Sequence, residues 1–62
     1  MQKIETLEPN ILLSVVNMKL RNDYQNLEDM CEDLNLSVNV LTYKLQSIGF
    51  IYSQKHNQFL SA

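Results

Sequence analysis

The sequence predicts a mainly α fold, in which three helices form the core and a small C-terminal β-hairpin follows them. Apolar residues recur at helical spacing in three successive segments, and residues typical of helix ends separate these segments. After the third segment, two short aromatic runs flank a polar turn, which is the pattern of a hairpin. With 62 residues, the chain has room for a single domain with one small core.

The first helix is predicted over residues 9–22, after an extended lead-in over residues 1–8 in which apolar residues show no period. Pro9 suits the first turn of a helix, because the N–H that it lacks would have no partner there in any case. Apolar residues then cover more than half of the helix circumference, so we expect this helix at the centre of the core. We therefore place a single domain over residues 9–62.

The second helix is predicted over residues 27–34, where an apolar stripe lies opposite four acidic residues. Asn26 can act as its N-cap, because an asparagine side chain accepts a hydrogen bond from the first helical turn. Asn35 can adopt the left-handed conformation that ends a helix. This two-faced pattern is typical of a helix that packs with one side on a core.

The third helix is predicted over residues 38–48, with Ser37 as its N-cap and Gly49 as its stop. Beyond it, the β-prone segments FIYS and QFL flank the turn segment QKHN, which predicts a hairpin at about residues 50–60. An isolated hairpin is unstable in water, so we expect this one to pack on the helices.

The predicted core combines the apolar stripes of the three helices with the start of the hairpin. It consists of Leu12, Val16, Leu20, Leu27, Met30, Leu34, Leu41, Leu45, Ile48 and Phe50. Phe50, Tyr52 and Phe59 are the candidates for the packed face of the hairpin.

Composition indicates a soluble cytoplasmic protein. Cys31 is the only cysteine, which rules out a disulfide within the chain and fits a reducing compartment. No export signal is visible, and no apolar run approaches the ~20 residues that a membrane-spanning helix needs. The formal net charge is −2, so the chain lacks the basic character of most proteins that bind nucleic acid.

The second and third predicted helices, with the bend between them, resemble the DNA-reading part of winged helix-turn-helix domains. The resemblance covers residues 26–60 and depends on the apolar skeleton and on the segment SIGFIY, which leads into the hairpin. The sequence departs from that family at Asn35, where a glycine is usual, and by having no strand-like segment between the first two helices. The implied fold is a helix-turn-helix-like, winged-helix-like core.

The blocks LLSVVNMKLRNDYQNLEDMCEDL, LQSIGFIY and NQF also resemble a family of short bacterial proteins that consist of one domain of unknown function. This second resemblance covers nearly the whole chain from Pro9 to Phe59. It implies a bacterial source and a free-standing domain, and it brings no activity, ligand or catalytic residue.

The outward side of the third helix is the candidate interaction face. It consists of Val38, Asn39, Thr42, Tyr43 and Gln46. This face is uncharged and carries an aromatic residue, as protein interfaces tend to, so we favour a module that binds another protein or a second copy of itself.

The alternative function is a DNA-binding regulator in which this helix reads bases in the major groove. Lys19, Arg21 and Lys44 would then be the candidate contacts to phosphate anions. Against this reading, cations are few and the acidic second helix would repel a polyanion. Lys19 and Arg21 also have a simpler role, since cations stabilise the C-terminal end of a helix.

Residues that could support an enzyme are isolated along the sequence. His56 stands alone in the hairpin turn, whereas a zinc site needs three or four ligands. Cys31 lies in an apolar stripe, where a buried, unreactive thiol is expected. We therefore expect no enzymatic activity, no catalytic residue, no metal and no cofactor.

Overall fold

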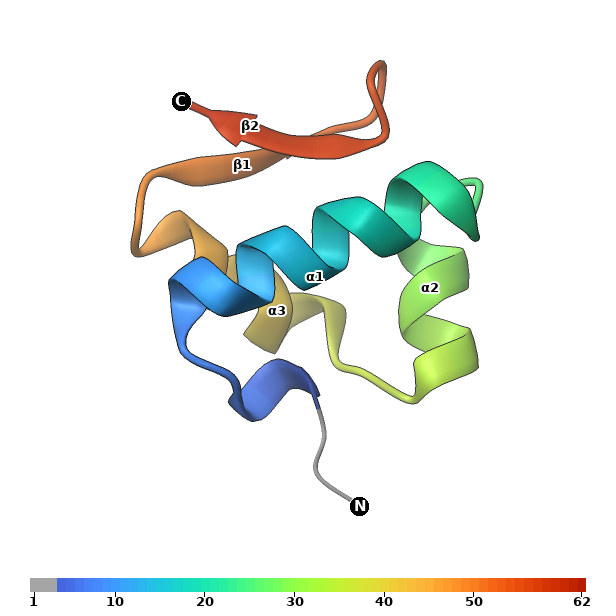
Figure 1. Ribbon diagram of the computed structural model, residues 1–62, viewed down its shortest axis with the longest axis horizontal. Coiled ribbons are helices and arrows are strands. Elements are labelled where there is room, and N and C mark those ends of the chain that lie inside the picture. The colour runs from blue at the N-terminus through green and yellow to red at the C-terminus, as the bar shows by residue number, and fades with distance from the viewer. Residues whose placement is uncertain (1–3) are drawn as a thin grey trace.

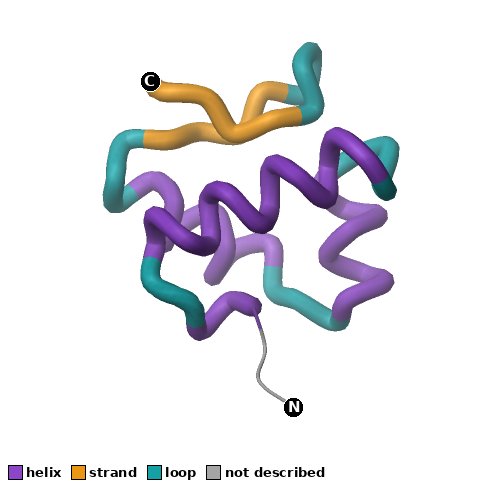
Figure 2. The backbone as a smooth tube through the Cα atoms, in the orientation of Figure 1, coloured by secondary structure: helices purple, strands orange, loops and turns teal. Residues whose placement is uncertain are grey.

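The computed structural model describes residues 4–62 and shows three α-helices followed by a two-stranded hairpin (Figure 1), which confirms the predicted mainly α fold. In chain order the elements are the 3-10 helix η1 (Ile4–Thr6), α1 (Pro9–Asn22), α2 (Leu27–Leu34), α3 (Val38–Gln46), β1 (Phe50–Ser53) and β2 (Gln58–Ser61). The hairpin lies along one side of α1, while α2 and α3 lie along the other (Figure 2). Strand β2 contacts α1, and β1 contacts α3.

The predicted helix ends are confirmed at α2. The side chain of Asn26 accepts a hydrogen bond from the N–H of Asp29 at 2.8 Å. Asn35 has the left-handed φ of 57°, and the N–H of Leu36 donates to the carbonyl of Cys31 at 2.7 Å, which closes the last turn.

Helix α3 is shorter than predicted, because it ends at Gln46 and not at residue 48. Its cap is as expected, since the Ser37 hydroxyl accepts the N–H of Val40 at 3.3 Å. Beyond Gln46, the N–H groups of Ile48 and Gly49 bond to carbonyls three residues back, and this tighter winding ends the α-helix before Gly49 turns the chain with a φ of 86°.

The lead-in is not extended over the residues that the structure describes. Ile4–Thr6 form η1, and the N–H of Leu7 donates to the carbonyl of Ile4 at 3.0 Å. Ile4 and Leu7 are half-buried against the core, so apolar packing folds this segment back onto the helices. Residues 1–3 of the predicted lead-in lie outside the described residues.

The buried core differs from the predicted one at its margin. It consists of Leu12, Val16, Leu20, Leu27, Met30, Cys31, Leu41, Leu45 and Phe59. The prediction was wrong for Leu34, Ile48 and Phe50, which are only half-buried. Leu34 ends α2, Ile48 lies in the turn between α3 and β1, and Phe50 begins β1. Cys31 and Phe59 lie inside instead.

The two strands pair antiparallel, with Ile51 opposite Leu60 and Tyr52 opposite Phe59. Phe50, Tyr52 and Phe59 all pack against the core, as predicted for the inner face of the hairpin. The rings of Tyr52 and Phe59 lie 5.5 Å apart with a tilt of 54°, an arrangement that aromatic pairs favour. Within residues 4–62, every helix is too short or too polar to cross a lipid bilayer.

Candidate interaction surface on α3 and β1

The predicted interaction face on α3 is partly exposed. Asn39, Tyr43 and Gln46 are exposed, and Tyr43 is the most open, with 75% of its surface accessible. Val38 and Thr42 are half-buried, because they lie next to the core-facing side of the helix. Exposure therefore increases across the five residues, from Val38 and Thr42 beside the core to Tyr43 in solvent.

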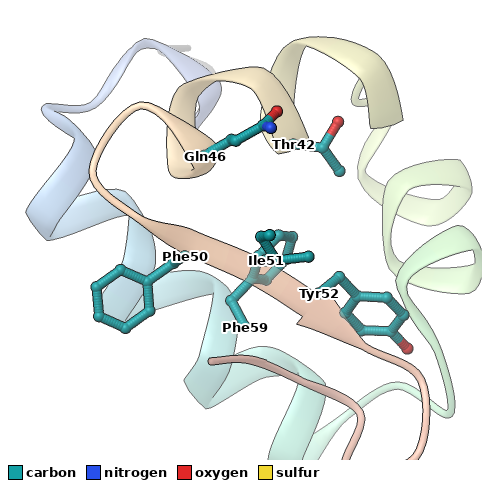
Figure 3. A pocket seen from close by; sticks show the side chains of 6 residues that line it. All are labelled: Thr42, Gln46, Phe50, Ile51, Tyr52 and Phe59. Carbon is teal, nitrogen blue, oxygen red and sulfur yellow. The ribbon is translucent and has the colours of Figure 1, made fainter. Parts of the chain in front are cut away.

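Two of these five residues, Thr42 and Gln46, also line a pocket of about 170 Å³ between α3 and the hairpin (Figure 3). The Thr42 hydroxyl lies 2.8 Å from the Val38 carbonyl and donates its hydrogen inside the helix. The methyl group of Thr42 is on the side of the hairpin (Figure 3), so this wall of the pocket is apolar. The remaining lining residues are Phe50, Ile51, Tyr52 and Phe59.

Strand β1 has one edge that does not pair with β2. Along an antiparallel strand, the backbone groups alternate between facing the partner strand and facing outward. Both backbone groups of Phe59 bond to the side-chain amide of Asn17, at 2.7 and 3.0 Å, so they face away from β1. Tyr52 lies opposite Phe59, and its N–H and C=O therefore face away from β2, as do those of Phe50 two residues earlier.

The side chain of Asn57 holds the hairpin turn against the helices. Its amide nitrogen donates to the carbonyls of Leu20 and Tyr24, at 3.0 Å each, near the end of α1. Its oxygen accepts the hydroxyl of Tyr52 at 2.7 Å, and that hydroxyl accepts the N–H of Leu27 at 3.2 Å. This network fixes the position of β1 relative to α1 and α2.

The sequence did not single out Asn17 or Asn57. Asn57 has the left-handed φ of 53°, and an asparagine in a polar hairpin turn is a recognisable signal for that conformation. Asn17 gives no local signal, because its partner Phe59 lies 42 residues away in the sequence.

The candidate anion contacts do not form one cluster. Lys44 donates to the carbonyl of Leu7 at 3.2 Å, just before α1 begins. Lys19 and Arg21 lie in the last turn of α1. A helix of 14 residues is about 21 Å long, so α1 separates Lys44 from the other two cations.

The acidic side of α2 forms a separate surface. Its exposed residues are Glu28, Asp29, Glu32 and Asp33. The hydroxyl of Tyr24 donates to the carboxylate of Asp33 at 2.5 Å. This hydrogen bond is the main cause that raises the pKa of Tyr24 to about 12; partial burial and the negative charges of Asp33 and Asp23 act in the same direction.

His56 and Cys31, the two residues considered for metal binding or catalysis, lie outside the interaction face on α3. His56 is exposed in the hairpin turn, and Cys31 is buried in the core with 3% of its surface accessible. Among the side chains that the structure describes, no group of three or more from histidine, cysteine, aspartate and glutamate could hold a metal ion. The absence of enzymatic activity stays a prediction.

The family model described as "Domain of unknown function (DUF4250)" matches residues 6–59 of the chain. The match confirms the resemblance to a single-domain family that the sequence blocks indicated. Among curated proteins and among solved structures, nothing matches the chain.

Proposed function

Since this chain belongs to that family, whose function is unknown, we propose a function from its own surface: a non-enzymatic module that binds another protein through the exposed side of α3. The observation that carries the proposal is Tyr43, an aromatic side chain with 75% of its surface exposed on an uncharged helix face. Its setting is the cytoplasm, in line with the single cysteine, Cys31.

Side-chain chemistry supports a protein partner. Interface centres are depleted in charge and enriched in tyrosine, since an aromatic ring buries a large area at a small entropic cost. Lys44 is the only charged residue in α3, and it donates to the carbonyl of Leu7. The partner is another protein or a second copy of the chain, because self-association stabilises small domains.

A DNA-binding regulator is the second candidate, and the exposed amides of Asn39 and Gln46 favour it. Both side chains can bond to the edge of an adenine in the major groove. Affinity for duplex DNA depends chiefly on phosphate contacts by cations, however, and α1 separates Lys44 from Lys19 and Arg21. We therefore rank this function below protein binding.

Site-specific photocrosslinking separates the two candidates. The full chain would carry a photoreactive phenylalanine analogue at position 43 or, as the matched control, at the exposed position 32 on α2. After irradiation in the producing cells, we expect protein adducts from position 43 at several times the yield from position 32. Nucleic-acid adducts from position 43 would favour the regulator, and equal yields from both positions would refute a specific role of α3.

A further inference from the structure

We propose that the unpaired edge of β1 binds an extended, acidic peptide segment by strand addition, with alternate apolar side chains of the segment entering the pocket between α3 and β1. This inference rests on the proposed protein-binding function and specifies the kind of partner. Addition of a strand to a sheet edge is a recurrent mode of peptide recognition, in which backbone bonds give affinity and pockets give specificity.

The first argument is the hydrogen-bonding capacity of the edge. The N–H and C=O groups of Phe50 and Tyr52 face away from β2, and no described residue pairs with them. They offer two donors and two acceptors in the spacing of a β-strand. The opposite edge differs, because Asn17 of α1 occupies the outward groups of Phe59 on β2.

The second argument is that the edge has no protection against pairing. Exposed sheet edges are usually blocked by a lysine, a proline, a bulge or a covering element. Strand β1 has the sequence FIYS, with no charge and no proline, and pairs in a regular register with β2. Ile51 also leaves 51% of its surface exposed there, which an added strand would cover.

The third argument is the shape and polarity of the adjoining pocket. Its walls include the methyl of Thr42, the side chain of Ile51 and the ring of Tyr52 (Figure 3). Successive side chains of a strand alternate between two faces, so every second residue of an added segment would point toward this pocket. An apolar side chain fits such walls, whereas a charged one would lose its hydration.

The fourth argument is charge complementarity, which selects an acidic segment. Residues 35–62, which form α3 and the hairpin, contain Lys44 and Lys55 and no aspartate or glutamate. A second copy paired at the same edge would bring two positively charged halves together, and its β1 offers no compensating charge. The exposed Lys55 follows β1 in the hairpin turn and attracts an acidic segment to this half of the molecule. The acidic side chains of the segment must point away from the start of α2, because the N–H of Leu27 bonds to Tyr52 of β1.

Amide hydrogen exchange on the full chain tests the inference. The probe is a synthetic peptide of alternating valine and glutamate, and the control has the same sequence with N-methyl groups on the amides of one edge. We expect the probe to slow the exchange of the Phe50 and Tyr52 amides by about tenfold, and the methylated peptide to leave them unchanged. The Ile51 amide faces Leu60 and serves as an internal reference.

Variants of the protein add a second readout. Thr42→Phe fills the pocket and should weaken probe binding at least about tenfold. Val40→Phe adds the same ring to an exposed position of α3 outside the pocket and should leave probe binding unchanged. If Thr42→Phe does not fold, the methylated peptide still decides the outcome. A matched peptide of alternating valine and lysine should bind more weakly by a similar factor.

Three outcomes would overturn the inference. They are no protection at millimolar probe, equal protection by the methylated or the lysine peptide, and protection that grows with protein concentration alone, which would assign the edge to a second copy. None of them would change the crosslinking result expected at Tyr43, so the protein-binding function can stand when strand addition fails.

Discussion

The hydroxyl of Tyr52 connects three parts of the chain at one atom. It accepts the N–H of Leu27 at the start of α2 and donates to Asn57 in the hairpin turn. Tyr52→Phe keeps the ring and removes both bonds, so we expect the free energy of unfolding to fall by about 1–2 kcal/mol in urea denaturation. Tyr43→Phe removes an exposed hydroxyl and should change the free energy of unfolding by less than about 0.5 kcal/mol. Equal effects of the two substitutions would contradict the bridging role.

The pKa of Tyr24 predicts a loss of stability at high pH. The bond to Asp33 favours the neutral phenol in the folded chain, and the folded pKa of about 12 lies above the ordinary tyrosine pKa of 10.0. Because the raised pKa belongs to the folded state, this contribution is complete below pH 10.0 and is lost as the pH rises toward 12.

Ultraviolet titration of tyrosinate measures this effect directly. We expect Tyr24→Phe to remove an ionisation centred near pH 12 and to flatten the decline of stability above pH 10.0. A variant that instead loses an ionisation near pH 10.0 would show that the bond to Asp33 does not hold in solution.

At the scale of single residues, sequence reasoning succeeded where the interaction is local. Asn26 and Ser37 cap helices through bonds to residues three positions away, and both were predicted. The bonds of Asn17 and Asn57 to distant segments depend on the packed tertiary structure. No local pattern encodes such contacts, and the unpaired edge of β1 became evident only with them.

At the scale of elements, α2 depends on its N-cap, because it has only 8 residues. Short helices have little intrinsic stability, so each satisfied terminal N–H matters. Asn26→Ala removes the bond to the N–H of Asp29 and should lower the free energy of unfolding by about 1 kcal/mol in urea denaturation. Asn22→Ala, at the exposed end of α1, is the matched control. Its free energy of unfolding should lie within about 0.5 kcal/mol of the native value. A larger loss at position 22 would rule out the cap as the cause.

The helix boundaries show what a sequence pattern leaves open at this scale. The apolar period of the third segment continues through Ile48, and this favoured a helix that reaches Gly49. The chain instead tightens after Gln46, since the strand that follows must turn back along α3. The spacing of apolar residues located the helix in the sequence, and the packing of β1 against α3 determined where the helix ends.

At the scale of the whole molecule, the hairpin is part of the core and not an appendage. Phe59 has 1% of its surface exposed and joins residues from all three helices in one buried cluster. The sequence assigned Phe59 to the packed side of the hairpin but placed Phe50 in the core. Which aromatic residue lies deepest depends on how far β2 reaches over α1, and the alternation of apolar residues does not determine that distance.

This placement predicts that loss of one hairpin side chain destabilises all three helices. A chain of 62 residues has a total stability of about 3–9 kcal/mol, at roughly 0.05–0.15 kcal/mol per residue. Phe59→Ala should cost about 3–5 kcal/mol, because it leaves a cavity in a core this small. We expect the melting temperature, followed by helical circular dichroism, to fall by about 12–40 °C, since each kcal/mol shifts it by about 4–8 °C in a domain of this size. Leu60→Ala, the neighbouring residue on the exposed face, should cost less than about 1 kcal/mol. If Phe59→Ala kept the native helical signal and melting temperature, the three helices would form a core without the hairpin, and β1 would lack the fixed position that strand addition requires.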